Sequence, residues 1–339
     1  MDILHDILGS FRSGDEIAES DAKPLFEALI AETDERLLAD VLTAWEQKGT
    51  TEDELFALAS IMRNRCIRVN TKHTAFVDAV GTGGSKAKTF NVSTAAAFVI
   101  AGAGVPVAKH GNRAATSNSG SADVLTALGV NAAVDAAKAG QCLDEIGICF
   151  MFAPNFHSLS PVLAKVRRDL GKPTIFNNLG PLCNPANAPH QVIGVWHPDM
   201  VAKTARVLAR LGTKKSWIVH GEDGLDEITL SGKTFVAEVA DDSVKTLEIS
   251  PADFGVEAAA LDGLSVASPL VSAGLITQIL EGRRNGDAAE RLVLMNAAAA
   301  IFLAGGKVDL EMAFQLAERN LREGAALAKL EELTAFTNK

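Results

Sequence analysis

Two strand–loop–helix units follow one another between residues 76 and 129, and this repeat limits what the chain can fold into. In each unit a short apolar segment, FVDAV or VPVAK, precedes a polar loop and then an apolar segment with helical spacing. Ser93 and Thr94 stand where hydroxyl caps of the first helix are expected. Consecutive units of this kind build a parallel sheet whose loops and helix N-termini share one edge. Free N–H groups and helix dipoles at such an edge bind phosphate.

The same region is free of acidic residues from Gly81 to Ala122, although the chain has 42 Asp and Glu among 339 residues and a net charge of −10. A random distribution would place about five acids in a stretch of this length. Glycine, small polar side chains and four cations stand there instead, and the cations are Lys86, Lys88, Lys109 and Arg113. A glycine-rich, positive segment in an acidic protein predicts a binding site for a small polyanion.

The rest of the chain begins with helices and then alternates between strands and helices. Apolar residues recur three and four positions apart through residues 1–70, which predicts helices only, with Thr50 or Thr51 as a cap before an acidic first turn. From Thr74 onward the alternation predicts a mostly parallel sheet, and three helices are expected at the end, over residues 269–280, 288–303 and 310–327. The predicted fold class is therefore α/β, with a small all-helical N-terminal domain and a large α/β domain. The strand candidates are FVDAV, VPVAK, ICFMFA, TIFNN, VIGVW and SWIVH, then the more antiparallel EITL, KTFVAEV and TLEIS.

Composition argues against several other classes of protein. The four cysteines show no C-x-x-C spacing, which favours free thiols in a reducing cytosol over disulfides or metal ligands. The first residues lack a basic run before an apolar one, and the most apolar stretch, residues 292–303, is too short to span a bilayer. An acidic chain without basic runs argues against a nucleic-acid partner. We therefore expect a cytoplasmic protein that binds neither membranes nor nucleic acid.

Seven sequence strings sharpen this interpretation. GTGG alone fits neither the dinucleotide-binding nor the Walker pattern and would be compatible with an ordinary tight turn. Over residues 78–227, however, it stands in one order with the other strings. The seven are GTGG…TFNVST, KHGNR, SGSADVLTALG, FMFAPNFH, VRRDLG, TIFNNLGPLCNPA and VHGEDGLDE. Together, and with the length of the chain, they resemble the anthranilate phosphoribosyltransferases of tryptophan synthesis.

The resemblance implies an organisation and a reaction. Residues 1–72, with about 158–186 packing back onto them, would form the small helical domain, and 73–157 with 187–339 the large, donor-binding domain. A homodimer through the N-terminal helices is also implied. The reaction joins the amine of anthranilate to C1 of phosphoribosyl pyrophosphate and releases diphosphate through an oxocarbenium-like state. A related phosphoribosyltransferase or a pyrimidine nucleoside phosphorylase with another acceptor stays as an alternative, as does a non-catalytic relative.

By resemblance, the donor binds to the acid-free segment. The glycines would cradle the diphosphate with backbone N–H groups, and Lys109 would reach the donor from the end of the second strand. For Ser93 and Thr94, plain helix capping is an equal and compatible role. The donor-binding set is Gly81, Thr82, Gly83, Gly84, Thr89, Asn91, Ser93, Thr94, Lys109, Ser117 and Ser121.

A magnesium site is expected at Asp226 and Glu227, with Ser93 as a third ligand. Adjacent carboxylates in a turn beside a phosphate site suit Mg²⁺, which takes one or two carboxylates together with phosphate oxygens and waters. From the residues alone, a solvated acidic loop would be the more common interpretation of this pair. The resemblance is what favours the metal site.

The acceptor needs a different set of residues. A carboxylate on an aromatic ring is recognised by an arginine fork, and Arg167 matches the acceptor arginine of the family, while Asn112 would hydrogen-bond the amine or carboxylate. No residue looks like a strong general base, so catalysis would rest on electrostatics and positioning, to which Lys109 and Arg167 contribute. The acceptor set is Gly81, His110, Asn112, His157, Arg167, Gly180 and Pro181.

Two positions depart from the family pattern. Ser85 follows GTGG where the family commonly has an acid, and we expect its neutral hydroxyl to lie beside the diphosphate of the donor. Ser158 follows His157 where the family often has proline, which leaves the pocket contacts around Ser158–Lys165 open.

Overall fold

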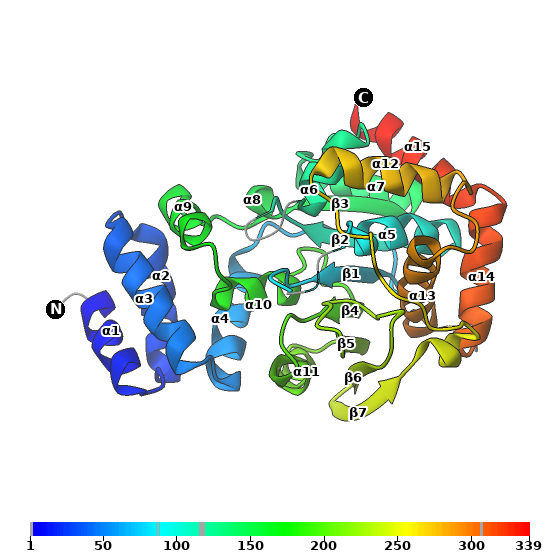
Figure 1. Ribbon diagram of the computed structural model, residues 1–339. Helices are drawn as coiled ribbons and strands as arrows, with labels where there is room; N and C mark the ends of the chain where they lie inside the picture. The colour runs from blue at the N-terminus through cyan, green and yellow to red at the C-terminus, as the bar shows by residue number, and fades with distance from the viewer. Residues whose placement is uncertain (1–2, 86, 88, 115–118, 306–307) are drawn as a thin grey trace.

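The computed structural model describes residues 3–85, 87, 89–114, 119–305 and 308–339, and its described N-terminal part is helical. Four helices lie there at one end of the molecule (Figure 1). The expected cap is confirmed at Thr51, whose hydroxyl accepts a hydrogen bond from the backbone N–H of Glu54 at 3.3 Å. The four are α1 (Ile3–Ser13), α2 (Glu19–Ala31), α3 (Glu35–Lys48) and α4 (Glu52–Arg65).

A seven-stranded sheet forms the centre of the described chain, in the order β3-β2-β1-β4-β5-β6-β7. The first five strands in this order pair in parallel. β6 pairs antiparallel with β5, and β7 pairs antiparallel with β6. This mostly parallel sheet confirms the expected fold class. EITL was wrongly expected to be a strand: Ile228 is held in a loop because the side chain of Asn296 bonds both its N–H and its C=O, each at 3.0 Å. The strands are β1 (Val77–Gly81), β2 (Val107–Gly111), β3 (Ile148–Phe152), β4 (His190–Gly194), β5 (Lys215–Gly221), β6 (Thr234–Ala240) and β7 (Ser243–Ile249).

Both faces of the central strands are buried, each in its own hydrophobic cluster. Val192 of β4 and Trp217 of β5 belong to the first cluster, and their neighbours Ile193 and Ile218 belong to the second. Because successive side chains of a strand point to opposite faces, a strand covered on both sides is apolar throughout. This is why VIGVW and SWIVH are recognisable in the sequence.

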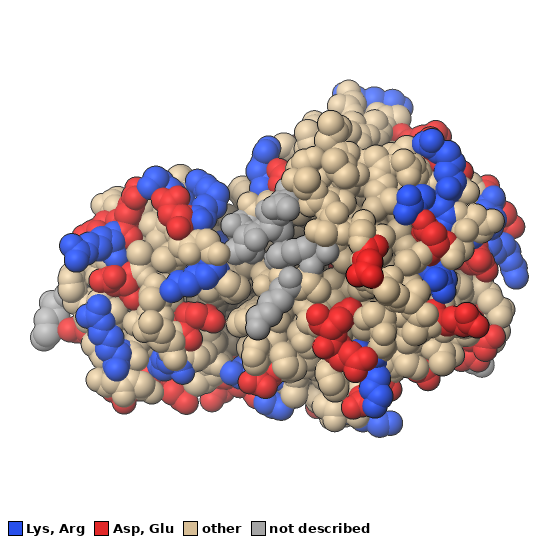
Figure 2. Space-filling view, in the orientation of Figure 1, with Lys and Arg blue, Asp and Glu red and all other residues tan. Residues whose placement is uncertain are grey.

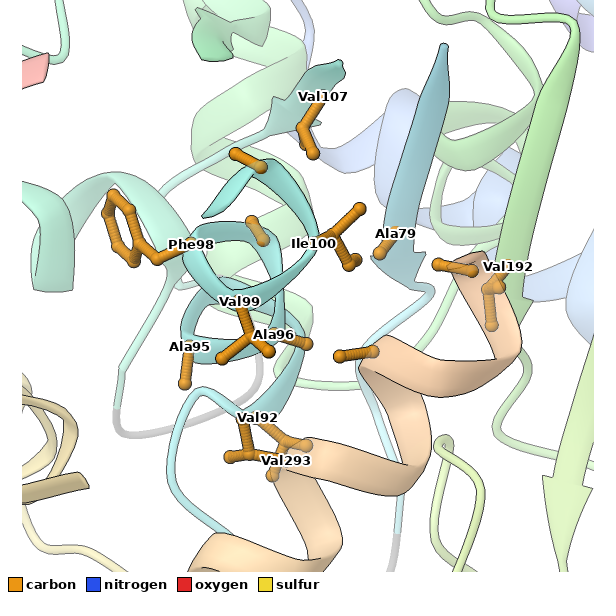
Figure 3. Packing of buried hydrophobic residues seen from close by; sticks show 14 of the residues in the cluster. Ala79, Val92, Ala95, Ala96, Phe98, Val99, Ile100, Val107, Val192 and Val293 are labelled. Carbon is orange, nitrogen blue, oxygen red and sulfur yellow. The ribbon is translucent and has the colours of Figure 1, made fainter. Parts of the chain in front are cut away.

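The first cluster is built around α5 (Val92–Gly102), which is buried on almost every side. Figure 3 shows Ile100 directed from α5 toward β1, and Val92 directed toward α13 (Ala288–Leu303). Both helices contain a run of buried alanines, Ala95–Ala97 in α5 and Ala297–Ala300 in α13. Other elements of this half are α6 (Ser121–Ala127), α7 (Ala136–Ile146), α8 (Ala153–Phe156), the 3₁₀ turn η1 (Pro251–Phe254) and α12 (Pro269–Leu280).

The second cluster joins the opposite face of the sheet to the N-terminal helices through α11 (Asp199–Arg210), α9 (Pro161–Leu170) and α10 (Ile175–Leu182). The prediction of TIFNN as a strand is wrong, because these residues begin α10. Thr174 starts a capping box with Asn177, whose side-chain oxygen accepts from Thr174 N at 3.0 Å. The apolar residues continue at helical spacing to Leu182, beyond the five-residue run that resembled a strand.

Four helices, not the expected three, end the described chain. The predicted helix over residues 310–327 is two helices, α14 (Leu310–Arg322) and α15 (Ala325–Thr337). Gly324 between them has a φ of +77°. This left-handed conformation suits glycine and ends α14.

Arg63 of α4 ties the N-terminal helices to α10 and α11. Its Nε donates to the carbonyl of Leu182 at 2.6 Å and its Nη1 to the carbonyl of Leu211 at 3.1 Å. Leu182 ends α10 and Leu211 directly follows α11. Arg63 is 8% exposed, so one buried guanidinium satisfies the carbonyl groups at the ends of two helices.

Candidate active site

A cavity of about 360 Å³ lies at the carboxyl ends of β1 and β2. The first turns of α5 and α6 and the acidic turn after β5 line one part of it. Residues of α8, α9 and α10 line the other part. Parallel α/β sheets keep their ligands at this edge. The acid-free segment of the sequence therefore forms about half of the cavity wall.

The GTGG loop leaves β1 in a conformation that needs glycine. Gly83 and Gly84 have φ values of +65° and +83°. The backbone N–H of Gly83 donates to Oδ2 of Asp226 at 3.0 Å, and a Cβ on Gly81 would lie 2.9 Å from the same oxygen. The loop thus presents its backbone to the cavity while packing directly against the acidic turn.

The acidic turn holds two adjacent, half-buried carboxylates. Burial and the neighbouring Asp226 raise the pKa of Glu227 to about 8, against the opposing effect of Lys109, and the backbone N–H of Ser93 donates to the Glu227 carboxylate. Such a pair is short of positive charge, and its hard oxygen donors fit a divalent cation. Over the described residues no cluster of three His, Cys, Asp or Glu side chains is present, so the donor set here is two carboxylates with the nearby Ser93.

Lys109 places a buried cation beside this turn. Its Nζ donates to the carbonyl of Ala79 at 2.6 Å and to Oγ of Ser93 at 3.2 Å, and the residue is 3% exposed. Burial lowers the pKa of Lys109, while Asp78 and Glu227 act in the opposite direction. The ammonium group therefore lies between β1, the first turn of α5 and the acidic turn.

Two neutral histidines lie at the opposite end of the cavity. Nδ1 of His110 lies 3.2 Å from the carbonyl of Gly180, and the ring of His157 bonds the carbonyl of Cys183. The two rings meet edge to face with centroids 5.1 Å apart. Burial lowers the pKa of His110 to about 3 and that of His157 to about 4. Because carbonyl oxygens only accept, the bonded nitrogens carry the protons, and Nε2 of each ring is a buried acceptor with no hydrogen-bond partner among the described residues.

Arg167 of α9 is the cation at this end. Its guanidinium lies 5.0 Å from the ring centroid of Phe176, and its Nε is buried with no hydrogen-bond partner in the part of the chain that the structure describes. Burial lowers the pKa of Arg167 to about 10, so the group stays charged at neutral pH. An arginine against an aromatic wall suits a planar anionic ligand.

Of the predicted site residues that the structure describes, all but one line this cavity. Thr94 is 1% exposed and lies outside the lining, while Ser117 lies outside the described residues. Of the residues named as donor-, acceptor- or metal-binding, those that line the cavity are Gly81, Thr82, Gly83, Gly84, Thr89, Asn91, Ser93, Lys109, His110, Asn112, Ser121, His157, Arg167, Gly180, Pro181, Asp226 and Glu227.

The expected caps of α5 are also wrong. The helix begins at Val92, so Ser93 and Thr94 lie inside its first turn and Asn91 is the N-cap residue. Asn91 makes no side-chain cap bond, because its Oδ1 accepts from Oγ of Ser119 at 2.6 Å and from Oγ of Ser272 at 2.8 Å. The side chain of Asn91 therefore does not cap the first turn of α5, and the backbone N–H of Ser93 in that turn donates to Glu227.

Ser85 does not behave as expected from the sequence. Its hydroxyl is directed to protein carbonyls, that of Ala87 at 2.5 Å and that of Gly224 at 2.9 Å, and the residue is 3% exposed. Gly224 belongs to the same turn as Asp226. Ser85 thus connects the glycine loop to the acidic turn instead of offering a free hydroxyl to a ligand.

Sequence reasoning missed several lining residues. Asn177 and Phe176 of α10 line the cavity, and Nδ2 of Asn177 donates to the carbonyl of Thr82 at 3.3 Å. Read as a helix, TIFNNLGP places Asn177 three and four residues before Gly180 and Pro181, on one helix face. The strand prediction concealed this signal. Met62 of α4 also lines the cavity, and no pattern in the sequence marks it.

Comparison with known proteins defines the class to which this fold and site belong. Residues 73–327 match the family described as glycosyl transferase family, a/b domain. The anthranilate phosphoribosyltransferase of Moorella thermoacetica is 42% identical over 325 residues, which cover 96% of this chain and 95% of that protein.

Solved structures agree with the sequence match. The crystal structure of anthranilate phosphoribosyltransferase from Thermus thermophilus superposes with a TM-score of 0.89 at 36% identity, over 100% of both chains. The Saccharomyces cerevisiae enzyme in complex with PRPP and Mg gives a TM-score of 0.88 at 28% identity, covering 99% of this chain and 98% of that one. This chain belongs to the anthranilate phosphoribosyltransferase family.

Proposed function

We propose that the protein transfers the phosphoribosyl group of phosphoribosyl pyrophosphate to the amine of anthranilate in tryptophan biosynthesis, giving N-(5-phosphoribosyl)anthranilate and diphosphate. The observation that carries this proposal is the division of one cavity into two ends. One end has a glycine loop, a buried lysine and a carboxylate pair, and the other has Arg167, an aromatic wall and two neutral imidazoles. The first end suits a polyphosphate and the second an aromatic acid.

At the donor end, the proposed role of the protein is to stabilise the leaving diphosphate. Backbone N–H groups of the GTGG loop and of the first turn of α5 supply fixed dipoles, and Lys109 supplies a buried positive charge. Such groups need no reorganisation as negative charge develops on the leaving oxygen. The donor-binding assignment covers the lining residues of this end, with Ser121 at the start of α6.

A magnesium ion is proposed as the cofactor of this end. Asp226 and Glu227 would hold it together with Ser93, because their oxygens are hard donors and the half-buried pair of like charges is stabilised by a cation. When bound, the ion neutralises diphosphate oxygens. The contribution of this chain is to fix the two carboxylates, which it does through the contact of Asp226 with Gly83 and of Glu227 with Ser93.

At the acceptor end, Arg167 is proposed to bind the carboxylate of anthranilate, and Asn112 to hydrogen-bond the acceptor. The Nε2 atoms of His110 and His157 accept, so they can receive the N–H groups of a neutral aromatic amine. The amine then attacks C1 while uncharged and loses its proton afterwards. Holding the amine over C1 supplies the positioning that makes this step effectively unimolecular.

We also propose the domain division and assembly implied by the resemblance. Residues 1–72 with about 158–186 would be the small domain. Helices α9 and α10 share the second hydrophobic cluster with α1–α4, and the same cluster continues into α11 and the sheet. The homodimer through the N-terminal helices is tested by light scattering at micromolar concentration, where a monomer would contradict it. We propose that the protein acts in the cytoplasm.

Phosphoribosyl pyrophosphate and anthranilate are the proposed partners, without nucleic acid or membrane. No helix among the described residues is both long and apolar enough to cross a membrane. Figure 2 shows charges of both signs interspersed over the face in view. Such mixing gives no extended basic surface there for a nucleic acid.

The proposal is tested by following the fluorescence of anthranilate in the presence of phosphoribosyl pyrophosphate and Mg²⁺. We expect fluorescence to disappear only when both are added, with one diphosphate released for each anthranilate consumed. Release of diphosphate with a different aromatic acceptor, and none with anthranilate, would favour a related transferase. Consumption of a pyrimidine nucleoside and inorganic phosphate would favour a phosphorylase.

A further inference from the structure

The ladder between the central strands β1 and β2 is unusual in this sheet. β1 and β2 are paired at Val77 and Val107 alone, whereas β1 pairs with β4, and β2 with β3, over five residues each. Continued regularly, a parallel ladder would join Ala79 N–H to Ala108 C=O and His110 N–H to Ala79 C=O. These two bonds lie at the carboxyl ends of the strands, where the cavity opens.

Three side chains take the place of these two ladder bonds. The N–H of His110 donates to Oδ1 of Asp78 at 3.2 Å, and the carbonyl of Ala79 accepts from Nζ of Lys109 at 2.6 Å. The carbonyl of Ala108 accepts from Nδ2 of Asn184 at 2.8 Å. The N–H of Ala79 bonds the carboxylate of Asp78. All four backbone groups are therefore satisfied although the strands do not bond one another there.

The same side chains are bonded to each other. Nδ2 of Asn184 lies 2.7 Å from Oδ2 of Asp78, and both residues are fully buried, at 0% exposure. Oδ1 of Asn184 also accepts from the N–H of Ala186 at 2.9 Å, which fixes the turn that follows α10. A buried carboxylate and amide with this many bonds have one orientation each.

The inserted group bonds elements that lead to both ends of the cavity, although Asp78 and Asn184 themselves lie outside its lining. On one side β1 leads into the GTGG loop. On the other, β2 carries His110, whose ring lies against Gly180 of α10, and Asn184 follows that helix. We propose that Asp78 and Asn184 are positioning residues that fix the distance between the donor end and the acceptor end by holding β1 and β2 apart. This assignment rests on the proposed function for the names of the two ends.

The chemistry explains why an acid and an amide are needed. Asp78 must accept from three N–H groups, those of Ala79, His110 and Asn184, which a carboxylate does and an amide oxygen with an adjacent NH₂ does not. Its negative charge also lies beside Lys109. Asn184 must donate to two oxygens and accept from one N–H, which only a carboxamide of this size provides.

Steady-state kinetics separate the two roles. Asn184→Ala keeps the charge of Asp78 and releases the turn after α10. We therefore expect the KM for anthranilate to rise about tenfold and that for phosphoribosyl pyrophosphate to change less than about twofold. Asp78→Asn should raise both KM values and lower kcat, because it also removes the charge beside Lys109. In the double variant the KM for anthranilate should stay within about twofold of that of Asp78→Asn, since both changes break the same bond.

A control of equal chemistry lies outside the cavity lining. Glu290 is fully buried and paired with Arg322, and Glu290→Gln also exchanges a buried carboxylate for an amide. It should lower stability and leave the ratio of the two KM values unchanged. Equal rises in both KM values for Asn184→Ala, or a loss of stability alone, would overturn the proposal. Should Asn184→Ala not fold, Asn184→Ser, which reaches only one acceptor, replaces it.

Hydrogen exchange gives a readout that does not depend on activity. Residues 175–187 should exchange faster in Asn184→Ala than in the unmodified protein, and at an unchanged rate in Glu290→Gln. Unchanged exchange in Asn184→Ala would overturn the positioning role by itself. If exchange responds but the unmodified protein does not consume anthranilate, the proposed function fails while the spacing role of the pair stands.

Discussion

Gly194 at the end of β4 lies directly against the backbone of Asp226, so that a Cβ on Gly194 would lie 1.7 Å from the Asp226 carbonyl oxygen. The carbonyl of Gly194 also accepts from Thr82 N at 2.8 Å. One glycine therefore contacts both the turn that carries the carboxylates and the loop that would bind the diphosphate. Its closeness to backbone, not to a movable side chain, makes the contact rigid.

Gly194→Ala should displace the acidic turn and lower activity strongly. The overlap is with backbone, so we expect a loss of about 1–3 kcal/mol in the free energy of unfolding, as in other overpacked sites. Urea unfolding and turnover measure the two effects. Gly9→Ala in α1, where nothing lies within 4 Å, is the control and should be neutral or stabilising by up to about 1 kcal/mol. Wild-type activity in Gly194→Ala would contradict the assignment of the turn.

Arg167→Ala should weaken anthranilate binding and leave donor binding nearly intact. A charge-assisted pair with a carboxylate contributes about 1.5–3 kcal/mol, and no described residue bonds Nε of Arg167 in its place. Separate calorimetric titrations of the two substrates measure this. Arg168→Ala, which changes an exposed neighbour, should bind both as the unmodified protein does. An equal loss for both substrates in Arg167→Ala would mean that Arg167 is structural.

Replacing Asp226 by Asn and Glu227 by Gln together should abolish turnover while the protein stays folded. The carboxylates lie in a turn, and the amide oxygen introduced at position 226 could still accept from the N–H of Gly83, so the fold keeps its contacts. The double variant should also lose any protection by Mg²⁺ against thermal unfolding, measured with phosphoribosyl pyrophosphate present. Full activity of the variant at sub-millimolar Mg²⁺ would remove the metal assignment.

Ser85→Ala should loosen the connection between the glycine loop and the acidic turn. Removing the hydroxyl leaves the carbonyls of Ala87 and Gly224 without this donor, at a cost of about 1 kcal/mol. We expect the KM for phosphoribosyl pyrophosphate to rise severalfold with little change for anthranilate. Ser158→Ala, at an exposed position, is the matched control. Unchanged kinetics in Ser85→Ala would show that the connection has no role in donor binding.

His110 should make stability depend on pH. Burial lowers the pKa of His110 to about 3, whereas the unfolded chain takes up the proton near its ordinary value of about 6.5. The stability contributed by the neutral ring is therefore present above about pH 6.5 and is lost as the pH falls toward 3. His110→Asn should lose less stability between pH 7 and pH 5 than the unmodified protein does, by about 1–2 kcal/mol. Urea unfolding at both pH values measures this, and parallel pH dependences would contradict it.

Local sequence patterns predicted the elements whose periodicity is long or whose burial is two-sided. The parallel strands and the N-terminal helices belong to this group. The meeting of His110, Arg167 and Asp226 in one cavity was implied by the resemblance instead. The prediction of TIFNN as a strand failed because a run of five residues fits both the strand period and the helix period. Only the packing of α10 in the second cluster decides between a strand and a helix.

Other features depend on contacts between segments far apart in the chain. The hydroxyl of Ser85 donates to the carbonyl of Gly224, and Oδ1 of Asn91 accepts from the hydroxyls of Ser119 and Ser272. A pattern within one loop contains neither partner, so neither role could be predicted. Asp78 and Asn184 are separated by 106 residues, and their bond replaces strand pairing that the sequence of β1 alone would suggest to be regular.

The guanidinium of Arg63 restricts how this enzyme can move during turnover. It donates to the carbonyls of Leu182 and Leu211, so one buried side chain of α4 holds the C-terminal ends of α10 and α11. Parting these helices would leave a charge in an apolar interior, at a cost of several kcal/mol. Helices α4, α10 and α11 should therefore travel as one rigid body, and substrates should enter and leave by displacement of loops around the cavity mouth, with no pivot at this junction.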